Sequence, residues 1–128
     1  MSENTNPLFG IHASALVLRE QRLKLIAANL ANADTPNYHA QDIDFKAALD
    51  AAGEAGNGLR VTDSHHIGAI AGDVARIERP AQQPSLDGNT VDTDIEHAAF
   101  ARAALEYRAS LTFLESRVRG LLTAITGQ

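Results

Sequence analysis

The chain of 128 residues contains no cysteine and no tryptophan, and only four phenylalanines and two tyrosines. The absence of cysteine excludes disulfide frameworks, thiolate nucleophiles and cysteine-ligated zinc sites. With so few aromatic rings, any core must be built mainly from Leu, Ile, Val and Ala. Such a composition favours closely packed helices over a thick β-sandwich, so we expect a mainly helical protein.

Long apolar runs and an excess of basic residues are also missing. No stretch reaches the roughly 18 apolar residues of a membrane span, and the first ten residues, MSENTNPLFG, lack the basic and apolar regions of a cleaved secretory signal. The formal net charge is −5 and the 11 Lys and Arg residues are scattered. We therefore expect no membrane span, no cleaved signal and no nucleic-acid partner.

Apolar residues recur with helical spacing near both ends of the chain. The first such segment runs from Leu8 to Ala33, with Pro7 as a start signal and Thr35-Pro36 as a stop signal. In the second segment, eight positions follow the 3.5-residue repeat of a coiled-coil seam: Phe100, Ala104, Tyr107, Leu111, Leu114, Val118, Leu121 and Ile125.

The start of the second helix is predicted from a capping signal. Thr93 and Glu96 have the spacing of a capping box. A helix from Thr93 to Thr126 would be about 50 Å long at about 1.5 Å per residue. The chain thus divides into an N-terminal helix with its following motif (1–38), an extended loop-rich middle (39–90) and a C-terminal heptad helix (91–128), the two ends forming one axial domain.

The middle of the chain shows no sustained period, and residues 51–90 are expected to be irregular. The runs Leu59–Thr62 and Val74–Ile77 are candidate strands of a short hairpin. Asp42 and Asp44 alternate with apolar residues through Phe45, which predicts an extended edge rather than a catalytic carboxylate pair.

Both terminal helices have wide apolar arcs but few partners within one chain. Residues flanking the C-terminal seam are small or apolar where a self-sufficient two-stranded coil would carry opposed charges: Ala103, Leu105, Ser110, Thr112 and Ala124. Pairing the two helices leaves much of each arc exposed. We expect the chain to be marginally ordered alone and to fold fully in an assembly.

The segment ANLANADTPNY (28–38) places two amides where a helix would ordinarily continue its apolar packing. Asn29 and Asn32 lie one turn apart, so each can satisfy carbonyls at the helix end or bridge to a neighbouring subunit. Asn37 suits a left-handed turn residue. On residue types alone, a helix end followed by a turn in an ordinary soluble domain is the simpler interpretation.

Chemical motifs are weak throughout. His65 and His66 would point to opposite faces of a strand, and Asp63 is the only carboxylate close to them, so we interpret them as a solvated loop pair. Ser64 lacks a third partner for a nucleophilic triad. We expect no metal, no cofactor and no enzymatic activity.

Three segments resemble the axial proteins of the bacterial flagellar rod and hook. AANLANADTPNY (27–38) is similar to their Asn-Ile/Leu-Ala-Asn core followed by Thr-Pro-Gly-Tyr. HAQDIDFKAAL (39–49) and SLDGNTVDTDIE (85–96) resemble the short proteins of the proximal rod in particular. Two departures stand out: Asn37 replaces the usual glycine, and Thr93-Asp94 occurs where a leucine is common. Asparagine tolerates positive φ, so we expect the turn to survive.

The resemblance implies a structural rod subunit of the flagellar basal body, exported unfolded without signal cleavage and packed by its terminal helices into a hollow, torque-transmitting axle that crosses the periplasm. It further implies contacts with copies of itself, other rod proteins, and an adaptor protein, export gate or membrane ring at the rod base. The predicted assembly interface comprises Leu16, Leu23, Ile26, Asn29, Leu30, Asn32, Thr35, Pro36, Tyr38, Phe100, Tyr107, Leu111, Leu114, Val118, Leu121 and Ile125.

Two alternatives remain open at this point. One is a small all-α soluble domain, either a binding module or an enzyme subunit, whose terminal helices pair within one chain. The other is a neighbouring protein of the proximal rod, against which the DGNTVD stretch argues.

Overall fold

The computed structural model describes residues 9–57 and 76–127. In that part of the chain it has three helices and one two-stranded sheet: α1 (Gly10–Ala31), β1 (Gln41–Ile43), α2 (Phe45–Asn57), β2 (Arg76–Glu78) and α4 (Thr93–Thr126). The prediction of a mainly helical chain with long terminal helices and a loop-rich middle is confirmed.

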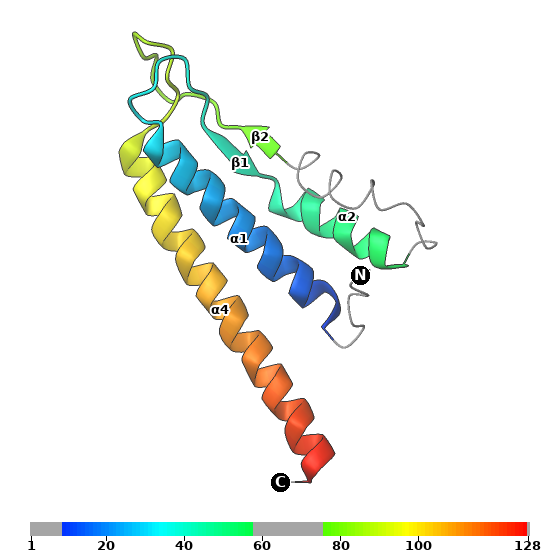
Figure 1. Ribbon diagram of the computed structural model, residues 1–128. Coiled ribbons are helices and arrows are strands. Elements are labelled where there is room, and N and C mark those ends of the chain that lie inside the picture. The colour runs from blue at the N-terminus through cyan, green and yellow to red at the C-terminus, as the bar shows by residue number, and fades with distance from the viewer. Residues whose placement is uncertain (1–8, 58–75, 128) are drawn as a thin grey trace.

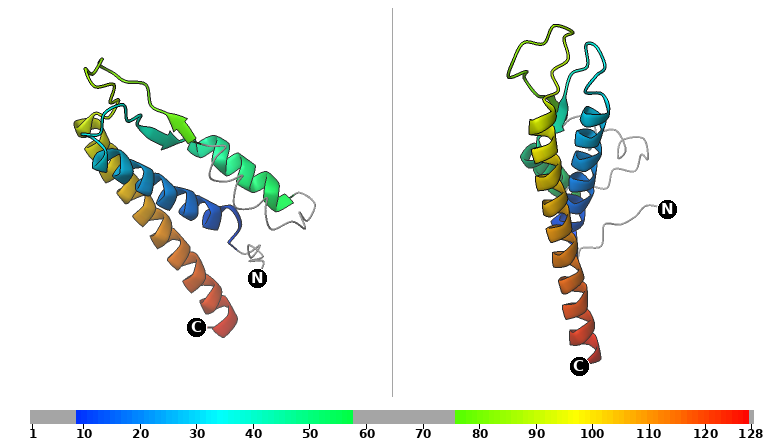
Figure 2. Two further views of the ribbon diagram at one scale, coloured as in Figure 1. Left: turned by 45° about the horizontal axis from the view of Figure 1, so that its top comes forward. Right: turned by 90° about the vertical axis from the view of Figure 1, so that its left-hand side faces the viewer.

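The two terminal helices lie side by side and run in opposite directions (Figure 1). α1 lies between α4 on one side and the sheet with α2 on the other. α4 has 34 residues and α1 has 22, so α4 continues well past the first turn of α1, as both views of Figure 2 show. The C-terminal half of α4 is therefore the least covered helix surface in the described part of the molecule.

The N-terminal cap of α4 differs from the predicted one. Asp92, not Thr93, is the capping residue, and its Oδ1 accepts hydrogen bonds from the backbone N–H groups of Asp94 (3.1 Å) and Ile95 (3.2 Å). Glu96 does not reach back to the cap as a capping box requires, because its side chain is 2% exposed and bonded elsewhere. The predicted capping box is wrong, although the predicted helix bounds hold.

The sheet joins β1 and β2 in antiparallel register, with Gln41 opposite Glu78 and Ile43 opposite Arg76. The candidate strand Val74–Ile77 overlaps β2, whereas Leu59–Thr62 lies outside the described residues. The extended edge predicted for residues 42–45 is present only up to Ile43, where β1 ends.

Helix α2 is not anticipated by the sequence analysis, which expected residues 39–49 to be extended. Phe45, Ala48 and Leu49 have the i, i+3, i+4 spacing of a helix, and all three face the apolar core. Asp44 caps this first turn by accepting from the N–H of Ala47 at 3.1 Å. The prediction failed because the polar and apolar residues alternate from 42 through the first residue of the helix at 45, which resembles strand spacing.

The apolar core is small and sits between α1 and the β1–α2 unit. Leu18, Ile43 and Ala48 form its buried centre, and Leu25, Phe45 and Leu49 pack against it. At about 1.5–3 kcal/mol for each large apolar side chain fully buried, so few residues supply a modest driving force. Much of what joins α4 to the rest of the chain is polar.

Candidate functional site: a polar junction and an apolar flank

The side chain of Asn29 joins the end of α1 to strand β1. Its Nδ2 donates to the carbonyl of Gln41 at 2.7 Å, and its Oδ1 accepts from the N–H of the same residue at 3.0 Å. A second Nδ2 hydrogen bond goes to Glu96 Oε2 (3.1 Å), and the Tyr38 hydroxyl donates to Oδ1 (3.3 Å). Asn29 is fully buried, and every donor and acceptor of its amide is used.

A second asparagine, Asn89, closes the C-terminal end of α1. Its Nδ2 lies 2.8–2.9 Å from the carbonyl oxygens of Asn32, Ala33 and Thr35, which belong to the turn that follows α1. Its Oδ1 accepts from the N–H of Val91 at 2.8 Å. Asn89 therefore couples the turn after α1 to the segment that leads into α4.

The turn after α1 and the loop before α4 approach closely at two left-handed residues. Asn37 has φ of 59°, as predicted for this position, and its N–H donates to the carbonyl of Asp87 at 2.9 Å. Gly88 has φ of +75°, and a Cβ there would lie 2.5 Å from Asn37 Oδ1. A side chain at residue 88 would have to adopt this left-handed conformation and displace the Asn37 side chain, so glycine suits this position.

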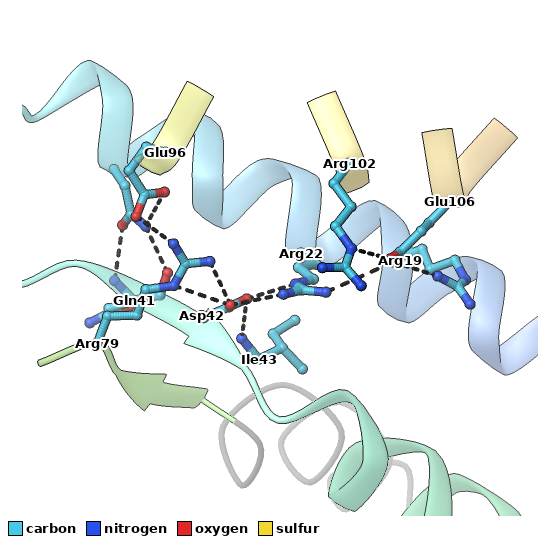
Figure 3. A network of polar contacts seen from close by, with 10 residues as sticks. Arg19, Arg22, Gln41, Asp42, Ile43, Arg79, Glu96, Arg102 and Glu106 are labelled. Carbon is cyan, nitrogen blue, oxygen red and sulfur yellow. Dashed lines mark hydrogen bonds and ion pairs between the residues drawn. The ribbon is translucent and has the colours of Figure 1, made fainter. Parts of the chain in front are cut away.

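Asp42 and Glu96 are buried carboxylates linked by one arginine. The Arg79 guanidinium donates to Asp42 Oδ2 at 2.6 Å and to Glu96 Oε1 at 2.7 Å, while Arg22 donates to both oxygens of Asp42 at 2.9 and 3.1 Å (Figure 3). We call Asn29, Asp42, Arg79, Asn89 and Glu96 the polar junction. It connects α1, β1, the segment after β2 and the first turn of α4.

The charges of the junction affect one another's protonation. Burial on its own would raise the pKa of Asp42, but the hydrogen bonds from Arg22 and Arg79 outweigh burial and hold that pKa below its ordinary value. The same contact with Asp42 raises the pKa of Arg22. The carboxylate is thus kept ionised despite being only 6% exposed.

A second polar contact joins the two long helices further from the junction. Arg19 Nη1 lies 2.8 Å from Glu106 Oε2, and Arg102 approaches the other Glu106 oxygen at 3.3 Å. The Arg19 guanidinium also lies over the Phe45 ring at 4.7 Å. Arg19 therefore contacts α4 and α2 at once (Figure 3 shows its place beside Glu106).

α4 presents two adjacent stripes along its length. The stripe facing α1 consists of buried or half-buried residues that are mostly small or charged: Glu96, Ala99, Ala103, Glu106 and Ser110. Roughly a fifth of a turn away, at about 3.6 residues per turn, lies a second stripe that we call the apolar flank: Phe100, Tyr107, Leu111, Val118, Leu122 and Ile125.

The apolar flank is only partly covered by the described residues. Tyr107 and Leu111 are half-buried, whereas the exposed fractions of Val118, Leu122 and Ile125 are 37%, 56% and 81%. A row of large apolar side chains at helical spacing with this exposure is typical of a surface that binds another helix.

The predicted interface residues fall into three groups by burial. Ile26 and Asn29 are fully buried within the single chain, so neither faces solvent. Half-buried are Leu16, Leu23, Leu30, Asn32, Tyr38, Tyr107, Leu111, Leu114 and Leu121. Exposed are Thr35, Pro36, Phe100, Val118 and Ile125. Most of the C-terminal seam thus coincides with the apolar flank or adjoins it.

Sequence reasoning missed the buried charges of the junction. Arg79 received no role, Glu96 was expected in a capping box with Thr93, and Asp42 was expected at an extended edge. Asn89 stood in a quoted motif without an assigned contact. One signal was available for Asn89, because Asp-Gly-Asn predicts a tight turn with a free amide; the pairing of residues 42, 79 and 96 leaves no local signature.

Metal and membrane sites are not found in the described residues. Within 9–57 and 76–127, no three His, Asp or Glu side chains gather as a metal site requires, and His65 and His66 lie outside these ranges. No helix of this part of the chain combines the length and apolar character needed to cross a bilayer.

The match to a family model defines the class of protein. The model described as "Flagella basal body rod protein" matches residues 9–39, which comprise α1, the Asn-Leu-Ala-Asn segment and the turn that Asn89 closes. This match, together with the full-length relatives described next, places the chain in the class of the flagellar basal body rod proteins.

Relatives that match nearly the whole chain identify the family within this class. The "Flagellar basal body rod protein FlgB" of Cereibacter sphaeroides is 50% identical over 123 residues, covering 93% of this chain and 94% of the relative. FlgB of Salmonella typhimurium is 44% identical over 122 residues, 88% of each, and FlgB of Aeromonas hydrophila is 40% identical over 132 residues, 100% of this chain and 99% of the relative. The chain belongs to the FlgB family.

Membership of this family makes the chain a structural component of the flagellar basal body, which assembles with other basal-body components, and not an enzyme. The relatives give no support to an isolated binding module or enzyme subunit.

Proposed function

We propose that this chain is a subunit of the proximal rod, packed through α1 and α4 into the wall of a hollow axle that transmits torque. The observation that carries the proposal is the apolar flank of α4, which the described part of the chain leaves partly open. A subunit that ends its own packing with an open apolar stripe is suited to bury that stripe against a neighbour.

The size of the stripe fits a stable contact. Each large apolar side chain that becomes fully buried contributes about 1.5–3 kcal/mol, at about 25 cal/mol per Å² of apolar area. Val118, Leu122 and Ile125 together then offset a substantial part of the cost of association. Helices of neighbouring subunits supply the matching apolar surface.

The interface that we propose keeps the predicted residues but assigns them different roles. Residues of the apolar flank, with Leu114 and Leu121 beside it and the half-buried Leu16, Leu23 and Leu30 of α1, contact neighbouring subunits. Ile26 and Asn29 act from within by holding α1 in place. The exposed turn at Thr35 and Pro36 provides a further contact at the opposite end of the helix pair.

The proposed partners are copies of this chain, other rod proteins, and the adaptor protein, export gate or membrane ring at the base of the rod. The resemblance of residues 85–96 to proximal-rod proteins supports a place near that base. We further propose that the rod crosses the periplasm and that subunits arrive through the flagellar export channel as extended chains, without signal cleavage. The absence of cysteine and the small apolar core suit passage in an unfolded state.

A charge placed in the seam tests the assembly role. Leu114→Asp and Ile125→Asp are expected to abolish rod assembly, because each places a carboxylate in an apolar contact. The measurement is motility of a strain whose own copy is replaced, together with the amount of variant protein exported. Ser116→Asp is the matched control, since Ser116 is exposed on the opposite side of the same helix segment.

Wild-type motility of both Asp variants would refute the proposed interface. Loss of motility in the Ser116→Asp control as well would show that any charge in this segment is harmful and would equally remove support for the apolar flank.

The monomer itself offers a second measurement. Limited proteolysis of the purified chain is expected to cut the C-terminal half of α4 before the residues around the polar junction. Equal protection of both regions, together with a cooperative thermal melt, would favour a self-contained domain.

A further inference from the structure

Three contacts between α1 and α4 follow one strict spacing. His12 stacks on Phe113 with 4.7 Å between ring centroids, Arg19 binds Glu106, and Asn29 binds Glu96. From each contact to the next, α1 advances by seven and then ten residues, while α4 moves back by the same seven and ten. All three contacts therefore belong to a single antiparallel register of the two helices.

The apolar contacts alone do not select this register. The stripe of α4 that faces α1 has Ala99, Ala103 and Ser110 at its centre, and these small side chains resemble one another in shape. A shift of one heptad would replace Ala103 by Ser110, which is of similar size, but would bring Glu106 to the place of Ala99 and Arg117 to the place of Ser110. Charged side chains, more than apolar ones, therefore distinguish the two alignments.

We infer that the Asn29–Glu96 and Arg19–Glu106 pairs, in addition to the Asn89 contacts at the end of α1, determine the register of α1 against α4. A polar group at a single position of a helix pair is an established way to specify register, at some cost in stability. Here two such pairs lie ten residues apart on both helices, so both are satisfied in one alignment and neither survives a shift of one heptad.

An alignment shifted by one heptad is disfavoured because the polar pairs between the two helices would be broken. A shift by seven residues would bring Ala103 opposite Asn29, Phe113 opposite Arg19, and Gly120 opposite His12. Glu96 would then lose its hydrogen bond from Asn29, and both of these residues are buried, at 2% and 0% exposure. Leaving buried polar groups without partners is costly.

The register also determines how far α4 extends beyond α1. In the observed alignment, His12 in the first turn of α1 reaches Phe113, and the helix continues to Thr126. A shifted register would lengthen or shorten this extension by a heptad. The inference concerns one chain only, so it can be tested without any assembly.

The natural absence of cysteine allows a direct test by cross-linking. A native reporter carries His12→Cys and Phe113→Cys, and a shifted reporter carries His12→Cys and Gly120→Cys. Both are treated, as the full-length monomer, with a short thiol-to-thiol cross-linker. The ratio of native to shifted cross-link is compared with and without the substitutions Asn29→Ala, Glu96→Ala, Arg19→Ala and Glu106→Ala.

The ratio is expected to fall by about fivefold for each polar pair removed, since one such pair corresponds to about 1 kcal/mol. Helical content by circular dichroism shows whether each variant is folded, and the ratio is compared only among folded variants. The control removes the surface pair within α1, Glu20→Ala with Lys24→Ala, and should leave the ratio unchanged. An unchanged ratio in the fourfold variant would overturn the inference.

A second variant covers the case in which the fourfold variant does not fold. In Arg19→Glu, the new carboxylate at position 19 faces the carboxylate of Glu106, so the two side chains repel each other. The substitution leaves the residues of the polar junction unchanged. The native cross-link should decrease and the shifted one increase, with helical content preserved. A ratio equal to that of the parent in this variant would also overturn the inference.

Discussion

The two ends of the α1–α4 pair are built differently. At the end near Asn29 and Glu96, polar side chains are buried and satisfied within the chain. At the other end, beyond Phe113, α4 carries exposed Leu122 and Ile125 and no comparable polar contact among the described residues. The first end is complete in one molecule, whereas the second is completed by neighbours under the proposed function.

The difference indicates that the residues that stabilise the monomer and the residues that mediate assembly lie at opposite ends of the helix pair. Substitutions at the polar junction should change the free energy of unfolding of the monomer. Substitutions of the exposed apolar side chains at the far end of α4 should leave that free energy nearly unchanged and act on assembly. Four experiments test this separation, ordered by the size of the expected effect on the monomer.

The largest loss is expected for Glu96→Ala. It removes the acceptor of the buried Asn29 amide and of one nitrogen of the half-buried Arg79, which keeps its contacts with Asp42. Truncating a buried ion pair from one side costs up to about 3–5 kcal/mol. Chemical denaturation of the monomer measures the change. Glu115→Ala, at an exposed position of the same helix, should change the free energy of unfolding by less than about 0.5 kcal/mol. Equal effects of the two substitutions would contradict the comparison.

Glycines at the two ends should respond with opposite signs. Gly88→Ala requires a positive φ and places Cβ against Asn37, so a loss of about 1–3 kcal/mol is expected. Gly120→Ala meets nothing within 4 Å and should stabilise its helix by about 0.5–1 kcal/mol. Thermal melts of both variants are the measurement, and a stabilising Gly88→Ala would disprove the close approach described for the junction.

Acid should weaken the junction through Asp42. Because the pKa of this carboxyl is lower in the folded chain, its contribution is present above the unfolded pKa near about 4 and is lost as the pH falls through the folded value. Melting temperatures between neutral pH and pH of about 2.5 measure the loss. In Asp42→Asn the neutral-pH stability should be lower and the acid-dependent part smaller. The same acid dependence in that variant would assign the effect to other carboxylates.

The smallest effect on the monomer is expected at the far end of α4. Leu122→Ser with Ile125→Ser should change the free energy of unfolding by less than about 0.5 kcal/mol, since both side chains are already exposed. Under the proposed function, the same double variant should impair rod assembly and motility. A large destabilisation of the monomer would show that these side chains are covered in the free chain.

Sequence patterns predicted the parts of the fold that depend on local spacing. The bounds of both long helices follow from apolar periodicity and from Thr35-Pro36, and positive φ at Asn37 follows from residue type. Helix α2 and the partners of Arg79 and Glu96 did not follow. A carboxylate in an amphipathic helix is ordinarily placed on the solvent side, and only the three-dimensional approach of residues 42, 79 and 96 shows why Glu96 is buried.

The way Asn29 binds Gln41 also has a consequence for solubility. β2 pairs with one side of β1, and the Asn29 amide takes both the N–H and the carbonyl of Gln41 on the other side, much as a further strand would. An unprotected strand edge is a template for pairing between molecules. By closing it with a side chain from its own helix, the chain removes one route to aggregation when many copies are concentrated at a growing structure.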